Sequence, residues 1–245
     1  MSKPSAAQRT PLTAGVLGGM GPDATVDFMA KVIAATSAET DQDHARMLVD
    51  HNPKVPNRQA ALLGNGENPG PVLAAMAKGL QEAGADFLVM PCNTAHAFAR
   101  DIRAAVSIPL VSIIDVTVDA CRDTGAVGVL ATDGCLNTGI YQDALRQANI
   151  ECVLPDADET AELMRLISAI KAGDRGEAIA LDMQGVGNAL VARGARAIIA
   201  GCTEIPLVLT EDLLDVPLVS STDVLAEATA AIAHGIIGRY FLKTE

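Results

Sequence analysis

The chain has 245 residues, of which 49% are apolar, enough for a large core in one domain or in two smaller ones. The formal net charge is −12, and the acidic residues are spread along the chain, which argues against nucleic acid and membrane surfaces as partners. No apolar run approaches the roughly 20 residues that span a bilayer, and the N-terminus lacks the apolar segment of a secretory signal. We therefore expect a cytoplasmic protein whose five cysteines, with no CxxC spacing, are reduced thiols.

Short apolar runs rich in β-formers alternate with stretches of helical spacing along the first half of the chain. In chain order, the predicted strands are 13–18, 46–53, 85–91 and 108–113. A helix is expected to begin near Pro22, with Asp23 in its first turn, and a second is expected over 71–84, ending at Gly84. This order of strands and helices predicts a parallel sheet covered by helices.

The same pattern then repeats in the second half. Three pairs of segments match in sequence and order: 13–21 with 126–134, 84–99 with 194–209, and 108–116 with 216–224. The spacing also agrees, because Gly15 precedes Cys92 by 77 residues and Gly128 precedes Cys202 by 74. The sequence therefore predicts an α/β protein of two similar lobes, each a parallel sheet flanked by helices, related by a pseudo-twofold with the active site between them.

The repeat also predicts where the lobes begin and end. Residues 1–113 plus 222–245 are expected to form the N-terminal lobe with Cys92, and residues 114–221 the C-terminal lobe with Cys202. The last helix is expected to start at an N-cap such as Thr222 and to pack on the first lobe.

Two cysteines occupy equivalent places in the repeat, at the point where a buried strand ends. Cys92 lies in VMPCNTAH and Cys202 in IIAGCTEIP. Ligands of open α/β sheets bind beyond the carboxyl ends of strands, so both thiols are expected to face one cleft. The helix expected after each would lower its thiol pKa through free N–H groups. The alternative is that they are small buried apolar residues, the interpretation we prefer for Cys121 and Cys152.

Three kinds of chemistry fit a thiol at such a place. A zinc site is disfavoured because Cys202 has no neighbouring histidine, and no metal is expected. His96 could activate Cys92 as a nucleophile, or it could cap the chain locally. Two thiols in matching settings are explained better by racemisation, in which one base removes the Cα proton from one face and the conjugate acid of the other supplies a proton to the opposite face.

The motifs MPCNTAH and GCTE, preceded by GVLGGMGPDAT, resemble the aspartate/glutamate racemase superfamily, most closely the aspartate racemases, over essentially the whole chain. Glutamate racemases usually have GCTH at the second cysteine. The resemblance implies a cofactor-independent racemase that interconverts L- and D-aspartate with Cys92 and Cys202 as its two bases, in two lobes and commonly as a homodimer. Glutamate or broad-spectrum racemisation remains the nearest alternative.

The resemblance also implies two cations that recognise the substrate. Arg58 falls in a segment, 52–60, whose arginine is thought to bind a carboxylate, and a guanidinium can do so through two parallel hydrogen bonds. Lys171 matches a lysine with a similar role. Without the resemblance, Arg58 would be an exposed loop cation and Lys171 the cation of a helix end before Gly173.

Further substrate-binding candidates lie beside the cysteines and in the glycine-rich loop. Hydrogen bonds to the α-carboxylate are expected from the side chains of Asn93, Thr94 and Thr203. Glu204 is expected either to couple to Cys202 or to favour a helix N-terminus electrostatically. The loop over 18–22, with Met20, is expected at the floor of the cleft, or else to form a tight strand–helix turn.

One departure from the superfamily concerns the second lobe, where ATDGCLNTGIY has Cys135 in place of a threonine and Thr138 in place of a serine. A thiol is a poor hydrogen-bond donor, so Cys135 is expected to weaken carboxylate binding if it faces the cleft.

Two hypotheses outside catalysis stay open at this point. The cleft could belong to a non-catalytic module that binds dicarboxylates, or Cys92 and Cys202 could form a redox disulfide.

Overall fold

The computed structural model describes residues 11–235. Its first half contains a four-stranded parallel sheet in the order β2-β1-β3-β4. The strands are β1 (Ala14–Gly18), β2 (Met47–His51), β3 (Phe87–Val89) and β4 (Leu110–Val111). Register pairs Gly15 of β1 with Leu88 of β3, so the carboxyl ends of both strands meet at one edge.

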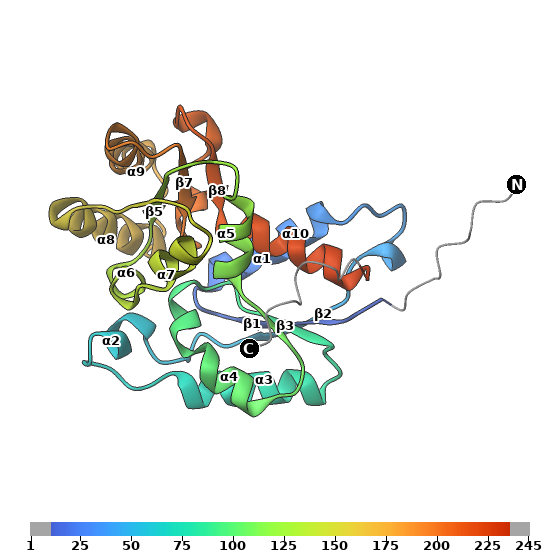
Figure 1. Cartoon of the computed structure of the whole chain (residues 1–245). Coiled ribbons are helices and arrows are strands. Elements are labelled where there is room, and N and C mark those ends of the chain that lie inside the picture. Colours follow the sequence, from blue (N-terminus) through green and yellow to red (C-terminus); the bar gives the residue numbers. More distant parts are fainter. Residues whose placement is uncertain (1–10, 236–245) are drawn as a thin grey trace, which may run out of the picture.

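The second half contains another four-stranded parallel sheet, in the order β6-β5-β7-β8. The strands are β5 (Val127–Leu130), β6 (Cys152–Val153), β7 (Ala197–Ala200) and β8 (Leu218–Ser220). The two orders are equivalent when β5 is matched to β1, which confirms the predicted two-lobed α/β architecture (Figure 1). Strand β6 has only two residues and was not predicted.

Helices flank both sheets and connect their parallel strands. In the first half they are α1 (Pro22–Ala35), α2 (Arg58–Leu62), α3 (Gly70–Glu82), α4 (Ala99–Ala105) and α5 (Ile113–Ala120). In the second half they are α6 (Asp133–Thr138), α7 (Ile140–Gln147), α8 (Ala157–Lys171), α9 (Glu177–Ala192) and α10 (Ser221–Ala233). Short 3-10 helices are η1 (Asp41–Asp43), η2 (Thr94–Phe98), η3 (Ile205–Leu207) and η4 (Glu211–Leu213).

Local sequence signals set several of the helix ends. Pro22 stands at the first position of α1, where its missing N–H has no intrahelical partner to lose, and Asp23 follows in the first turn. Helix α10 begins two residues earlier than expected. Its N-cap is Ser220, whose hydroxyl accepts a hydrogen bond from the Asp223 amide, and the predicted cap Thr222 lies fully buried inside the helix.

Helix α10 packs against α1 and α5, so three helices meet where the two lobes join (Figure 1). Their apolar side chains belong to one core that also includes Val16 of β1 and Val129 of β5. This shared core fixes the position of one sheet relative to the other, which positions the strand ends described below.

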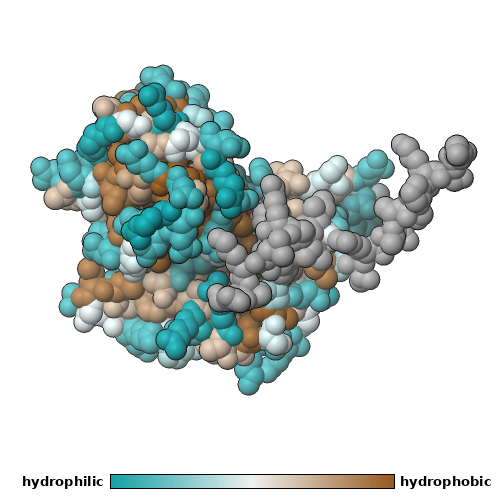
Figure 2. All heavy atoms as spheres, viewed as in Figure 1, coloured by the Kyte–Doolittle hydropathy of each residue, from teal (hydrophilic) through white to brown (hydrophobic). Residues whose placement is uncertain are grey.

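The surface and the remaining cores agree with the composition. Each sheet has a second apolar layer on its other face, built around Leu88 in one lobe and Ile198 in the other. Figure 2 shows a face covered mainly by hydrophilic side chains, with hydrophobic ones in smaller areas. Within residues 11–235, no helix is both long and apolar enough to cross a membrane.

Candidate active site

The two cysteines leave equivalent strands at the carboxyl edge of each sheet. Cys92 follows β3 by three residues and Cys202 follows β7 by two. Both are nearly buried, with 6% and 5% of their surface exposed. The chain turns sharply at Pro91, because the Cys92 amide donates to the Met90 carbonyl at 2.7 Å.

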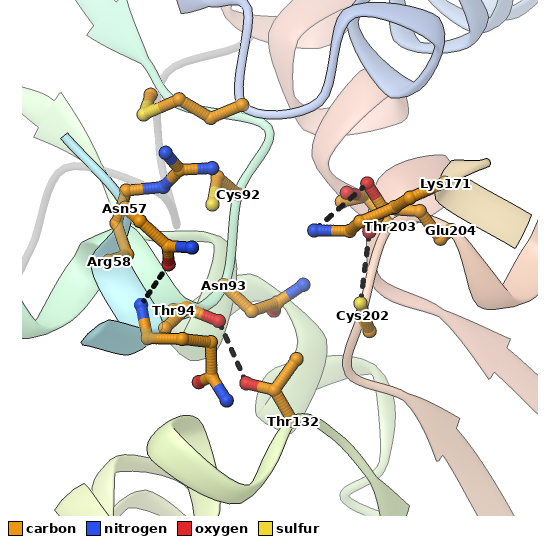
Figure 3. Close-up of a pocket in the computed structure, with 12 residues that line it drawn as sticks. Asn57, Arg58, Cys92, Asn93, Thr94, Thr132, Lys171, Cys202, Thr203 and Glu204 are labelled. Carbon is orange, nitrogen blue, oxygen red and sulfur yellow. Dashed lines mark hydrogen bonds and ion pairs between the residues drawn. The ribbon is translucent and has the colours of Figure 1, made fainter. Parts of the chain in front are cut away.

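The thiols lie on opposite sides of one pocket (Figure 3). All nine residues predicted to form the site line this pocket: Met20, Arg58, Cys92, Asn93, Thr94, Lys171, Cys202, Thr203 and Glu204. Three residues that the sequence did not single out complete the lining: Asn57, Gln59 and Thr132. The structure therefore brings the predicted residues together around one pocket.

Two cations face the pocket from different lobes. Arg58, the first residue of α2, donates from Nη1 to the carbonyls of Val55 and Pro56 at 3.2 and 3.1 Å, which holds its guanidinium beside Cys92. Lys171, the last residue of α8, forms an ion pair with Glu204, Nζ to Oε1, at 3.6 Å. The expected helix end is present, because Gly173 has a left-handed φ of 98°.

Glu204 contacts the second thiol directly. The Cys202 Sγ–H donates to Glu204 Oε2 at 3.0 Å, and the carboxylate is 5% exposed. Burial raises the pKa of the Cys202 thiol well above its usual value, and the charge of Glu204 raises it further, while Lys171 acts in the opposite direction.

The expected lowering of the pKa by a following helix is therefore wrong for Cys202. Burial and the charge of Glu204 outweigh the lowering that the backbone N–H of Glu204 provides. The segment after Cys202 forms only the three-residue 3-10 helix η3, which lacks the aligned dipoles of an α-helix. A short 3-10 helix, η2, also follows Cys92.

Side chains next to Cys92 bind the opposite lobe. Asn93 accepts a hydrogen bond from the Tyr141 hydroxyl at 2.7 Å and donates to Ser221 Oγ at 3.0 Å. The Ser221 hydroxyl in turn donates to the carbonyl of Ala200, two residues before Cys202. This chain of buried groups links the two cysteine loops, so Asn93 has a positioning task besides lining the pocket.

The threonines of the two lobes also meet. Thr94 Oγ1 and Thr132 Oγ1 share a hydrogen bond at 3.0 Å, and both line the pocket. Thr132 is the N-cap of α6 and accepts from the Cys135 amide. That cap places Cys135 on the inner side of the helix, where it is 1% exposed and outside the pocket lining.

Cys135 therefore does not meet the condition under which it was expected to weaken carboxylate binding, because it does not line the pocket. Burial, with the nearby charge of Cys92, raises the pKa of Cys135 to about 12. All five cysteines are free thiols, so the redox disulfide is not formed in this structure.

His96 does not contact the thiol that it was proposed to activate. Its Nδ1 lies 2.9 Å from the Cys92 carbonyl oxygen, and its Nε2 accepts a hydrogen bond from the Ile113 amide at 3.2 Å. Burial lowers the pKa of His96 to about 4, so the ring is neutral at ordinary pH. Of the two interpretations, local capping is the one that the contacts support.

A larger chamber continues outward from the pocket between the lobes. It has a volume of about 850 Å³ and shares Arg58, Lys171 and Glu204 with the inner pocket. Apolar side chains of α8, including Met164 and Ile167, line it together with polar groups. At its rim, Arg175 of the second lobe forms an ion pair with Asp23 of the first.

Comparisons with known proteins agree with this architecture. Residues 17–229 match the Asp/Glu/hydantoin racemase family. The structure superposes on the aspartate racemase of Picrophilus torridus with a TM-score of 0.82 and 31% identity, over 91% of this chain and 94% of that one. The broad-specificity amino-acid racemase RacX of Bacillus subtilis is 28% identical over 225 residues, which cover 89% of this chain and 96% of RacX.

A glutamate racemase of Corynebacterium glutamicum is 35% identical over 133 residues, which cover 52% of this chain and 47% of that enzyme. The named relatives thus act on different amino acids, while the match to the family extends over most of the chain. The chain belongs to the Asp/Glu/hydantoin racemase family, and it is an isomerase of the kind that acts on amino acids.

Proposed function

We propose that the chain is a cofactor-independent racemase that interconverts L- and D-aspartate with Cys92 and Cys202 as its two bases. The observation that carries the proposal is the position of the two thiols, at equivalent strand ends of two similar lobes and on opposite sides of one pocket. A planar carbanion-like state between them can be protonated from either side, which is the requirement for inversion at Cα.

The reaction needs one thiolate and one thiol at a time. The thiolate takes the Cα proton on its side, and the opposite thiol gives its proton to the other face of Cα. The net result is inverted substrate, with the protonation states of the two sulfurs exchanged. Burial and the charge of Glu204 raise the pKa of Cys202, which favours its thiol form, the form that donates a proton.

The remaining pocket residues fit the charges of an amino dicarboxylic acid. Arg58 and Lys171 lie on different sides of the pocket, so they can bind two carboxylates at once. An α-carboxylate held by cations and hydroxyl donors, such as Thr94 and Thr203, stabilises the charge that develops on Cα. Because the thiols are nearly buried, these interactions act with little competition from water.

The second candidate is broad-specificity amino-acid racemisation, favoured by the outer chamber. Aspartate would fill little of a chamber of about 850 Å³ that begins beside Arg58 and Lys171. A longer side chain could extend into it along Met164. The similarity to RacX of Bacillus subtilis, a broad-specificity amino-acid racemase, supports the same alternative.

The test is deuterium uptake at Cα, measured by NMR for L- and D-aspartate incubated separately in D2O. Wild type is expected to exchange and invert both enantiomers. Cys92→Ala and Cys202→Ala should each lose inversion and retain exchange of one enantiomer at most, whereas the control Cys121→Ala, a buried thiol outside the pocket, should behave as wild type.

Parallel incubations with glutamate and with neutral amino acids distinguish the two candidates. Faster inversion of longer amino acids than of aspartate would favour the broad-specificity enzyme. Binding of aspartate by wild type without exchange of any amino acid would overturn both candidates in favour of a dicarboxylate-binding module.

A further inference from the structure

The two thiols have matching backbones but different partners. Cys202 Sγ lies 3.0 Å from Glu204 Oε2. Among residues 11–235, no side chain is hydrogen-bonded to the sulfur of Cys92, and the equivalent position two residues on is Thr94, which binds Thr132 instead. The repeat therefore supplies two similar thiols, of which one has a carboxylate in contact.

That carboxylate connects a buried group to an exposed one. Glu204 has 6% of its side chain exposed, and its second oxygen pairs with Lys171 Nζ at 3.6 Å. The Lys171 side chain is 44% exposed, and both residues line the outer chamber. Figure 3 shows the contacts of Glu204 with Cys202 and with Lys171. A path thus leads from the Cys202 sulfur through the two oxygens of one carboxylate to the outer chamber.

The glycine-rich loop of the first lobe leaves room for this arrangement. A Cβ atom at Gly21 would lie 2.9 Å from Glu204 Oε1, closer than such atoms normally approach. The loop that the sequence placed at the cleft floor therefore packs against the carboxylate of the opposite lobe, and a glycine at position 21 allows that contact.

We propose that Glu204 is a proton relay that exchanges the proton of Cys202 with solvent, an inference that rests on the two-base racemisation proposed above. The Cys202 S–H bond breaks, its proton bonds to Glu204 Oε2, and a thiolate and a neutral carboxyl group result. The carboxyl group then gives the proton to water in the chamber, while the Lys171 ammonium keeps its own protons. The reverse sequence returns a proton to the sulfur.

The reaction requires such a route. Each inversion leaves Cys202 in the opposite protonation state, so repeated turnover of one enantiomer needs a proton to enter or leave a sulfur that is 5% exposed. Burial and the charge of Glu204 both raise the pKa of Cys202 and so favour its thiol form, while the charge of Lys171 acts in the opposite direction. Cys92 and Arg58 are further titratable groups close enough to Lys171 to interact with its charge. A proton acceptor in direct contact is therefore needed to release the proton.

The experiment follows hydrogen isotopes in Glu204→Gln, which keeps the shape of the side chain but cannot accept a proton at the same site. The control is Glu177→Gln, an exposed residue at the start of α9. Each protiated enantiomer is incubated in D2O to low conversion, and deuterium is measured in recovered substrate and in product. Cys92→Ala identifies the enantiomer from which Cys202 removes the proton, since that variant can exchange only this one.

In wild type, the proton taken by Cys202 is lost to D2O, so recovered substrate of that enantiomer contains deuterium. In Glu204→Gln the same proton returns to Cα, and deuterium in recovered substrate is expected to fall at least about tenfold for this enantiomer, with no change for the other. The alkaline limb of the pH–rate profile should also move to lower pH, because the charge that raises the pKa of Cys202 is gone.

Equal deuterium in wild type and Glu204→Gln, or an equal fall for both enantiomers, would overturn the relay. Glu204→Asp retains a carboxylate and should show intermediate exchange. If Glu204→Gln does not fold, exchange by Glu204→Asp identical to that of wild type would overturn the relay. Absence of exchange by wild type with aspartate, glutamate and neutral amino acids alike would reject racemisation itself, so the two proposals fail in different ways.

Discussion

The hydrogen-bonded chain behind the cysteines predicts a measurable loss of stability in Tyr141→Phe. Tyr141 is fully buried and its hydroxyl donates to Asn93 Oδ1 at 2.7 Å, while Asn93 is 2% exposed. Removing the hydroxyl leaves a buried acceptor without this donor, which costs about 1–3 kcal/mol of unfolding free energy. For a chain of this length, that loss corresponds to a fall in Tm of about 2–6 °C.

The assay is urea unfolding followed by far-UV circular dichroism, with racemisation rates measured on the same samples. The control is Thr229→Val, because Thr229 is equally buried and its hydroxyl donates to the Leu225 carbonyl within α10. That carbonyl also accepts a backbone hydrogen bond of the helix, so the loss of unfolding free energy should stay below about 1 kcal/mol. Because Asn93 follows Cys92, Tyr141→Phe should also lower kcat/KM about tenfold. Unfolding and activity unchanged in Tyr141→Phe would refute the reasoning.

Three further predictions concern charge and pH. Arg58→Lys should lower kcat/KM for aspartate about 10–100-fold, since an ammonium cannot make two parallel hydrogen bonds to a carboxylate; an unchanged value in steady-state assays would remove Arg58 from substrate binding. His96 has a folded pKa of about 4 against 6.5, so the unfolded chain binds the extra proton and stability should fall by about 1.4 kcal/mol per pH unit as pH drops from 6.5 towards 4. Urea unfolding of His96→Gln should show a slope smaller by about one proton, and an unaltered slope would contradict the assignment. Burial raises the pKa of Cys121 from 9.0 to about 12, so its contribution is present below pH 9 and should be lost at about 1.4 kcal/mol per unit as pH rises towards 12. Cys121→Ala should remove that part of the alkaline slope, and an identical slope in both proteins would count against it.

The fold could be predicted because each lobe repeats the same apolar runs at nearly the same intervals. A buried parallel strand appears in sequence as an uninterrupted run of β-branched and aliphatic residues, such as the one that contains Ala197–Ala200. Strand β6 lacks such a run, since its two residues, Cys152 and Val153, pair with β5 at the edge of the sheet and are only partly buried. Its existence depends on the neighbouring strand and could not be predicted from local sequence.

The position of the cysteines could be predicted for the same reason, because parallel strands of a repeat end at equivalent edges. Of the residues that were missed, Thr132 follows the end of β5 by two residues, whereas Asn57 and Gln59 approach from the start of α2, outside the strand ends. Thr132 reaches the pocket through its hydrogen bond to Thr94, and Gln59 through its contact with Asp133 of the other lobe. Such neighbours are set by the packing of one lobe on the other, which a single sequence does not specify.

Cys92 and Cys202 have equivalent backbone positions but different side-chain partners, and this difference has a kinetic consequence. L- and D-aspartate have the same free energy in water, so their equilibrium constant is unity and kcat/KM must be equal in the two directions, whatever Glu204 does to Cys202. A one-sided relay can therefore act only on kcat and KM together, by changing which protonation form of the enzyme accumulates. If Glu204 keeps Cys202 supplied with a proton, the form with Cys202 as thiol and Cys92 as thiolate predominates, and the enantiomer deprotonated by Cys92 should have the lower KM and the lower kcat. In Glu204→Gln, kcat and KM for this enantiomer should approach the values for the other enantiomer, while kcat/KM stays equal between the two. Equal KM values for the two enantiomers in wild type would argue that the different partners of the two thiols have no part in turnover.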